Sequence, residues 1–169
     1  MADASAFDHT SPRRVRYDQL DLQSAALLSD PDPVANQANF AALVSMAFGW
    51  HWVGFYRVDR SELVLGPFQG PVACTRLSKD RGVCAAAWSR NETLVVDDVD
   101  HFPGHVVCSP ESKSELVVPV RDAQGEVRAV FDVDSAVKAD FGEEDAERLQ
   151  RLIDAAASRL IDESTPFDE

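Results

Sequence analysis

The chain has 169 residues, of which 45% are hydrophobic, a size that supports one buried core and is small for two. Its 16 Lys and Arg against 29 Asp and Glu give a formal net charge of −13, which argues against nucleic acid or an anionic membrane as a partner, because both need a basic face. No apolar run approaches the length of a membrane span, and the N-terminus lacks a basic-then-apolar signal pattern. We therefore expect a cytoplasmic protein.

Two helices are predicted ahead of any strand. Residues 1–14 are polar and are predicted to form a flexible tail, and a first helix is expected from about Val15 to Ser29. The prolines in Asp30-Pro-Asp-Pro33 end that helix. Pro33 also suits the first turn of a second helix, which is expected to run to about Phe48 and to close at Gly49.

The middle of the chain changes to patterns that are typical of strands. Residues 50–58 and 62–65 predict a hairpin, and alternation along its first strand places Trp52 and Tyr56 on one face. Four shorter elements are expected next: a loop at 66–71, a strand near 72–76 that carries Cys74, a helix at 81–88 that carries Cys84, and a strand at 93–96.

The last third of the chain predicts two strands and a helix. Residues 116–121 and 127–134 are joined by a short turn, which favours an antiparallel pair. Asp140 is the expected cap of a helix that runs to about Ile161, and residues 162–169 are predicted to be a second flexible tail. Helices at the two ends of a mainly antiparallel sheet predict a single α+β domain over residues 15–161.

The final predicted strand has two different faces. Its apolar face, which we expect to pack on helices, consists of Val127, Ala129, Phe131 and Val133. The opposite face carries Asp132 and Asp134, one strand repeat or about 7 Å apart. If this face lines a pocket, the two aspartates are suited to bind a cation, and if it faces solvent they are ordinary surface acids.

Residues 101–115 contain a cysteine, two histidines and two glutamates in a segment that its two prolines break, and such loops often carry reactive groups. No Cys-x-x-Cys is present, and Pro103-Gly104 separates His101 from His105, so structural zinc is not favoured. A cysteine hydrolase using Cys108 and a histidine is chemically feasible, although no oxyanion hole is evident. Each cysteine also fits a small buried apolar residue, which suits Cys74 and Cys84 better than Cys108.

Six segments occur along the chain in this order: Trp52-Val-Gly-Phe-Tyr56, Leu65-Gly-Pro-Phe-Gln-Gly-Pro-Val-Ala-Cys74, Gly82-Val-Cys84, Val99-Asp-His-Phe-Pro-Gly-His105, Ser114-Glu-Leu-Val-Val-Pro119 and Asp132-Val-Asp-Ser135. Together they resemble the free methionine-(R)-sulfoxide reductases, which are single-domain proteins with a GAF fold. The resemblance covers roughly residues 15–160. The chain departs from the family at Ala85, where glycine is common, and in the variable residues 109–111.

The resemblance implies an oxidoreductase that acts on sulfur and reduces free L-methionine (R)-sulfoxide to L-methionine. Cys108 would be the nucleophile that becomes a sulfenic acid, and Cys74 the likelier thiol to convert it to a disulfide. Cys84 would be an auxiliary or alternative resolving thiol. Thioredoxin would then reduce the disulfide, which gives the enzyme a role in oxidative stress. The resemblance implies no metal and no organic cofactor.

The same resemblance assigns the substrate contacts. Glu115 would contact the sulfoxide oxygen and act as the acid, which requires burial to raise its pKa. Asp132 and Asp134 would accept hydrogen bonds from the substrate ammonium. Trp52 and Tyr56 would wall the pocket around the S-methyl group, and backbone N–H groups near Cys108 would meet the carboxylate. A homodimer formed by the terminal helices is also expected.

Two other functions are compatible with the sequence. A GAF module can bind a small molecule and signal, or it can act as a thiol redox sensor whose disulfide alters contact with a partner. The chain ends shortly after its last predicted helix, without an effector domain of the kind that sensor modules control, and this favours the enzyme.

Overall fold

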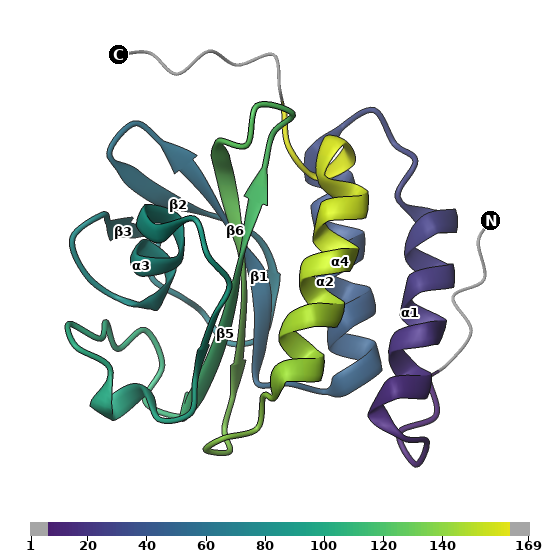
Figure 1. Cartoon of the computed structure of the whole chain (residues 1–169), viewed down its shortest axis with the longest axis horizontal. Coiled ribbons are helices and arrows are strands. Elements are labelled where there is room, and N and C mark those ends of the chain that lie inside the picture. The colour runs from purple at the N-terminus through teal and green to yellow at the C-terminus, as the bar shows by residue number, and fades with distance from the viewer. Residues whose placement is uncertain (1–6, 163–169) are drawn as a thin grey trace.

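The computed structural model describes residues 7–162 and contains one sheet flanked by helices (Figure 1). The predicted tails at residues 1–6 and 163–169 lie outside the described residues. The helices are α1 (Arg13–Leu27), α2 (Pro33–Phe48), α3 (Val83–Arg90) and α4 (Glu143–Leu160), with a short 3-10 turn, η1, at Val99–His101. The strands are β1 (Trp52–Asp59), β2 (Glu62–Gln69), β3 (Arg76–Ser78), β4 (Leu94–Val96), β5 (Ser114–Arg121) and β6 (Val127–Ser135).

The strands form an antiparallel sheet in the order β3-β2-β1-β6-β5-β4. Helices α2 and α4 cover one face, and α1 packs outside them, while α3 and the long loops cover the other face (Figure 1). The expected α+β architecture, with a mainly antiparallel sheet between helices from the two ends of the chain, is confirmed. Among residues 7–162, no helix is both long and apolar enough to span a bilayer.

Alternation along β1 and β6 creates the two faces. On the helical side, Phe55 and Phe131 pack with their ring centroids 4.9 Å apart, and Phe40 of α2 lies 5.1 Å from Phe131. All three rings are fully buried, and each contributes about 2–3 kcal/mol by leaving water. The residues between them in sequence point to the other side of the sheet. The expected facing of Ala129, Phe131 and Val133 is therefore confirmed.

The predicted loop at 66–71 is wrong for its first four residues, because β2 continues to Gln69. Pro67 is tolerated there since β3 pairs only with residues 62–64, which leaves the far edge of β2 unpaired beyond them. The register of β1 and β2 shifts between Gly54 and Tyr56. A β-carbon on Gly54 would lie 2.4 Å from Cβ of Phe68, so only glycine allows the strands to approach this closely.

Three other boundaries differ from the prediction. Cys74 lies before β3, not in a strand, because pairing starts only at Arg76. Val127 packs on the α3 side and not on the helical face, since a register shift between Val120 and Arg121 moves the start of β6. Helix α1 begins at Arg13 and Phe7 is buried in the core, so the ordered chain starts before the predicted limit of residue 14.

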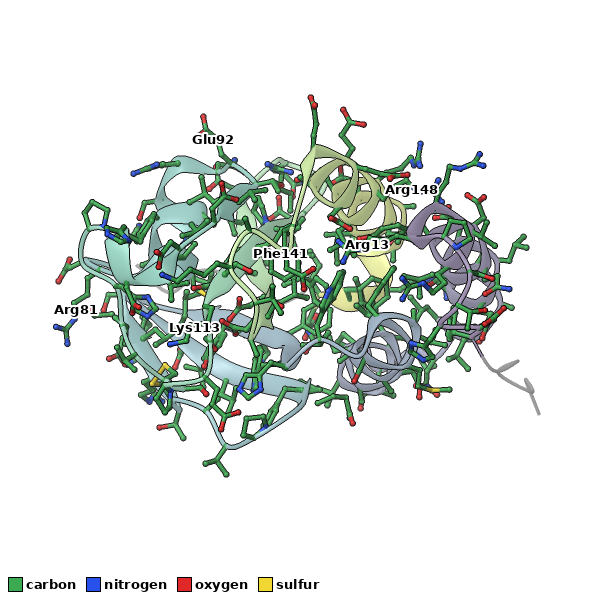
Figure 2. The ribbon with its side chains drawn as sticks, turned by 90° about the horizontal axis from the view of Figure 1, so that it is seen from below. Arg13, Arg81, Glu92, Lys113, Phe141 and Arg148 are labelled. Atoms are coloured by element: carbon green, nitrogen blue, oxygen red, sulfur yellow. A yellow bond between two sulfur atoms is a disulfide. The ribbon has the colours of Figure 1, made fainter. Side chains whose placement is uncertain are left out.

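The predicted cap of the last helix is also wrong. Gly142 is the N-cap of α4, and its backbone N–H donates to the Asp145 carboxylate at 2.9 Å. Asp140 instead accepts hydrogen bonds from Ser135 and from Arg13, which reaches from α1 toward the start of α4 (Figure 2). An ion pair between Arg13 of α1 and Asp140, in the loop between β6 and α4, replaces the expected local cap.

Candidate active site

The face of the sheet under α3 contains a cavity into which most of the predicted site residues converge. It is lined by Trp52, Tyr56, Val72, Ala73, Leu77, Arg81, Gly82, Val83, Cys84, His105, Val106, Cys108, Ser109, Ser112, Glu115, Asp132 and Asp134. The cavity therefore contains seven of the eight predicted site residues. The eighth, Cys74, is joined to one of them by a disulfide.

Strand register explains why the acids meet. Glu115 of β5 and Trp52 of β1 both stand opposite Asp134 of β6, which places the three side chains in one row across the sheet. Asp132 lies one repeat along β6, opposite Gly54. The missing side chain of Gly54 leaves room for the Trp52 ring, since a β-carbon there would lie 2.6 Å from its Cη2. Residues far apart in sequence thus form the floor of the cavity.

Burial makes the carboxylic acids hard to ionise. It is the main cause that raises the pKa of Glu115 well above its ordinary value, and the neighbouring Asp132 charge adds to it. The pKa of Asp132 is raised by burial and then by Asp134. Burial raises the pKa of Asp134 to about 7, against the opposing effect of a hydrogen bond from Ser112. The cavity floor therefore holds protons at neutral pH and gains from a bound cation.

Cys84 belongs to this acidic group. It lies in the first turn of α3, is 4% exposed, and its thiol contacts Glu115 Oε1 at 3.8 Å. Burial, followed by the charges of Asp132 and Glu115, raises the thiol pKa, so Cys84 is held as a neutral thiol. Donor atoms of Cys84, Glu115 and Asp132 lie within 4.8 Å of one another. A metal would need all three groups deprotonated, whereas burial favours their neutral forms.

Aromatic rings form one wall of the cavity. The ring of Trp52 stacks on Phe68 at 5.3 Å and lies 5.8 Å from Tyr56. The Tyr56 hydroxyl donates to the carbonyl of Cys74 at 2.9 Å, which fixes the chain beside the disulfide. Trp52 Nε1 and Asp132 Oδ1 are buried without a hydrogen-bond partner among the described residues. Both residues line the cavity, so a polar ligand can satisfy them.

The disulfide joins Cys74 and Cys108 across 34 residues, with the two Cα atoms 5.4 Å apart. Both cysteines are partly exposed, so an external thiol can reach the bond. Cys84 is the free cysteine. The structure therefore brings the predicted nucleophile and the preferred resolving thiol together, and the roles of all three cysteines stay predictions.

The two histidines of the 101–115 segment lie in different environments. His105 lines the cavity, and burial lowers its pKa, so it is neutral there at neutral pH. His101 points to solvent and its Nδ1 lies 2.9 Å from Asp98. Lys113, close in sequence to Cys108, donates to the carbonyl of Pro110.

Four polar residues that line the cavity were not among the predicted site residues: Arg81, His105, Ser109 and Ser112. Arg81 is exposed at the end of the molecule opposite α1 (Figure 2) and brings a permanent positive charge to the cavity. Its position just before Gly82 and Cys84 is the signal that could have indicated it. The serines carry no such signal, because serine is common in any surface loop.

The chain is similar to GAF domain proteins and to free methionine-R-sulfoxide reductases. A family model described as GAF domain matches residues 32–160. GAF domain-containing protein A of Dictyostelium discoideum is 47% identical over 140 residues, covering 82% of this chain and 88% of that protein. Free methionine-R-sulfoxide reductase of Saccharomyces cerevisiae is 39% identical over 142 residues, covering 79% and 76%. The structure of free methionine-R-sulfoxide reductase from Neisseria meningitidis with its substrate has a TM-score of 0.86 and 45% identity, covering 91% and 93%.

Proposed function

The chain belongs to the free methionine-R-sulfoxide reductases of the GAF domain family, and from this premise we propose that it reduces free L-methionine (R)-sulfoxide to L-methionine. The observation that carries the proposal is a partly exposed Cys74–Cys108 disulfide beside a cavity whose floor consists of buried acids. A thiol pair and a protonated acid are the groups that sulfoxide reduction requires.

The proposed reaction begins with the reduced enzyme. The Cys108 thiolate attacks the sulfoxide sulfur and an acid protonates the oxygen. The oxygen passes to the Cys108 sulfur as its bond to the substrate sulfur breaks, so Cys108 becomes a sulfenic acid and methionine leaves. The Cys74 thiol then attacks the sulfenic sulfur and releases water, which forms the disulfide. An external dithiol restores both thiols and is itself oxidised. One sulfoxide and one dithiol therefore yield methionine, water and one new disulfide.

Glu115 is the proposed acid. Its burial and its neighbours hold it protonated at neutral pH, so it can donate to the sulfoxide oxygen. Donation leaves a negative charge in the cavity, which is unfavourable beside Asp134 unless a cation is bound. The substrate ammonium supplies that cation. Substrate binding thus makes the proton of Glu115 easier to donate.

The two ends of the substrate meet opposite charges. Asp132 and Asp134 are the proposed acceptors for the ammonium, and the unpartnered Asp132 Oδ1 supports this role. The proposed carboxylate contacts are backbone N–H groups beside Cys108, with Arg81 adding positive potential at the rim. Trp52 and Tyr56 would pack on the S-methyl end. Methionine sulfoxide inside a polypeptide lacks both termini, so we expect the enzyme to exclude it.

Thioredoxin is the proposed reductant, because a protein dithiol can reach a partly exposed disulfide. We propose a cytoplasmic location and a homodimer built from the terminal helices. The large exposed side chain of Leu22 on α1 supports such an interface.

Steady-state turnover tests the proposal. The enzyme is supplied with dithiothreitol and free methionine-(R)-sulfoxide, and methionine is quantified by chromatography. We expect turnover of the R epimer, at most trace turnover of the S epimer, and none with Cys108→Ser. A signalling GAF module or thiol sensor would release no methionine. Full activity of Cys108→Ser would refute the assigned nucleophile.

A further inference from the structure

We infer that His51 is a positioning residue for the proposed reduction: its ring holds the turn Ser109–Ser112, which fixes Cys108 at one end and the Ser112–Asp134 contact at the other. The inference rests on the proposed function for its consequence in turnover, although the contact and its effect on the disulfide can be measured without any sulfoxide.

The backbone of His51 is held in place by the sheet and by Gly70. It precedes Trp52, the first residue of β1, which pairs with Asp134 of the neighbouring strand. The backbone of Gly70 packs closely against it, since a β-carbon at Gly70 would lie 2.8 Å from the carbonyl oxygen of His51. The side chain of His51 is 15% exposed. A ring held in this way can act as a fixed point for a loop that packs against it.

The ring contacts the turn that follows Cys108. His51 Nε2 lies 3.0 Å from Ser109 Oγ, a contact between residues 58 positions apart. The same oxygen accepts a hydrogen bond from the backbone N–H of Glu111 at 3.3 Å, and Ser112 N–H donates to the carbonyl of Ser109 at 3.4 Å. Ser109 therefore joins the internal hydrogen bonds of the turn to the sheet.

The second nitrogen of the ring adds little. His51 Nδ1 lies 3.7 Å from Glu111 Oε2, but the Glu111 side chain is 74% exposed. An exposed pair at this distance is weak because water and salt screen it. The contact with Ser109 is the one that holds the turn.

Each end of the turn is next to a residue that takes part in the proposed reaction or in substrate binding. Cys108, next to Ser109, is the proposed nucleophile, and Ser112 is 7% exposed and hydrogen-bonds to Asp134, a proposed ammonium ligand. In the oxidised protein the Cys74–Cys108 bond also holds this segment. In the reduced protein that bond is gone and the His51–Ser109 contact remains to keep Cys108 beside Cys74 and the cavity.

The His51–Ser109 contact should affect how easily the disulfide is reduced. The His51–Ser109 contact and the disulfide favour the same placement of the turn, so each makes the other easier to form. Without the contact, the reduced turn gains freedom, and closing the disulfide requires more ordering. Loss of His51 should therefore make the disulfide easier to reduce. A single hydrogen bond limits the change to about tenfold in the equilibrium constant.

The experiment measures the thiol–disulfide equilibrium of the whole protein. The Cys74–Cys108 disulfide takes up two electrons and two protons from reduced dithiothreitol, which becomes its cyclic disulfide. The fraction oxidised is read by alkylation and mass spectrometry across dithiothreitol buffers of set ratio. We expect the constant for disulfide formation to fall threefold to tenfold in His51→Ala, where tenfold corresponds to about 30 mV.

Three further variants separate a hydrogen bond from packing. In His51→Gln the side-chain amide can occupy the place of Nε2, and we expect a constant within twofold of wild type. Ser109→Ala should reproduce the effect of His51→Ala, and the double variant should shift no further than either single one. His101→Ala, which removes an exposed histidine of the same segment, is the matched control and should leave the constant unchanged.

An unchanged constant in both His51→Ala and Ser109→Ala would overturn the inference, as would additive effects in the double variant. Equal losses in His51→Gln and His51→Ala would also overturn it, because packing would then suffice. If His51→Ala fails to fold, Ser109→Ala decides alone, since that serine lies in a surface turn. If the protein reduces no sulfoxide but the variants show these shifts, the proposed function is refuted, while the inferred effect of His51 on the disulfide stands.

Discussion

Asp134→Asn should remove a pH dependence of stability that this buried acid causes. Burial raises the folded pKa of Asp134 from 3.8 to about 7, so the folded protein keeps a proton that the unfolded chain has lost. The folded state is therefore favoured by this group below about pH 4, and the advantage disappears progressively as pH rises to about 7. Asparagine has no ionisable proton and keeps an oxygen acceptor for Ser112.

The size of the effect follows from the shift in pKa. At about 1.4 kcal/mol for each pKa unit, the free energy of unfolding falls by about 4 kcal/mol once the pH exceeds 7. Coupling to Glu115 and Asp132 spreads part of this over all three acids, so we expect about 2–4 kcal/mol for Asp134 alone. The variant should thus be more stable than wild type at pH 8, and the difference should vanish near pH 4.

The assay is denaturant unfolding at pH 4, 5, 6, 7 and 8, with the disulfide intact in both proteins. Asp154→Asn, an exposed acid on α4, is the matched control and should change stability by less than about 0.5 kcal/mol at every pH. Parallel stability curves for wild type and Asp134→Asn would refute the reasoning. A variant whose stability relative to wild type falls as the pH rises would refute it as well, because the sign would be wrong.

Three more predictions concern individual residues. Glu115→Gln should lower kcat with free methionine-(R)-sulfoxide by about 10²–10⁴, and unchanged steady-state turnover would remove Glu115 as the acid. Cys84→Ser should still form the Cys74–Cys108 disulfide after sulfoxide treatment, as peptide mapping would show; a lost disulfide would make Cys84 a required thiol. Gly54→Ala should cost about 1–3 kcal/mol in denaturant unfolding, because its β-carbon would lie 2.4 Å from another β-carbon on the next strand. Gly142→Ala, where the added β-carbon would lie 4.0 Å from Asp145 Oδ2, is the control and should cost less than about 0.5 kcal/mol.

The sequence was sufficient to predict most of the fold, because the fold depends on local periodicity. The second helix was expected between Pro33 and Phe48 and has these bounds, since a proline and a glycine mark its two ends. The errors occur where distant residues decide. The limit of β2 depends on how long β3 pairs with it, and the cap of α4 depends on Arg13, which competes for Asp140 from the other end of the chain.

The candidate site likewise has features that local sequence predicts and features that depend on distant residues. Periodicity placed Asp132 and Asp134 on one face of a strand, but whether that face lined a cavity depended on α3 and the loops above it. The pairing of Cys74 with Cys108 followed from family resemblance and not from spacing. His51 could not be predicted at all, because no local pattern connects a residue before β1 with a serine 58 positions later.

The measurement that tests the central claim most directly is a single turnover without reductant. The fully reduced enzyme is mixed with one equivalent of free methionine-(R)-sulfoxide, quenched with an alkylating agent and mapped by mass spectrometry. The account predicts one methionine for each Cys74–Cys108 disulfide formed, and in Cys74→Ser one methionine with a sulfenic acid on Cys108. Methionine formed while Cys108 remains a free thiol, or no methionine from the reduced enzyme, would contradict it.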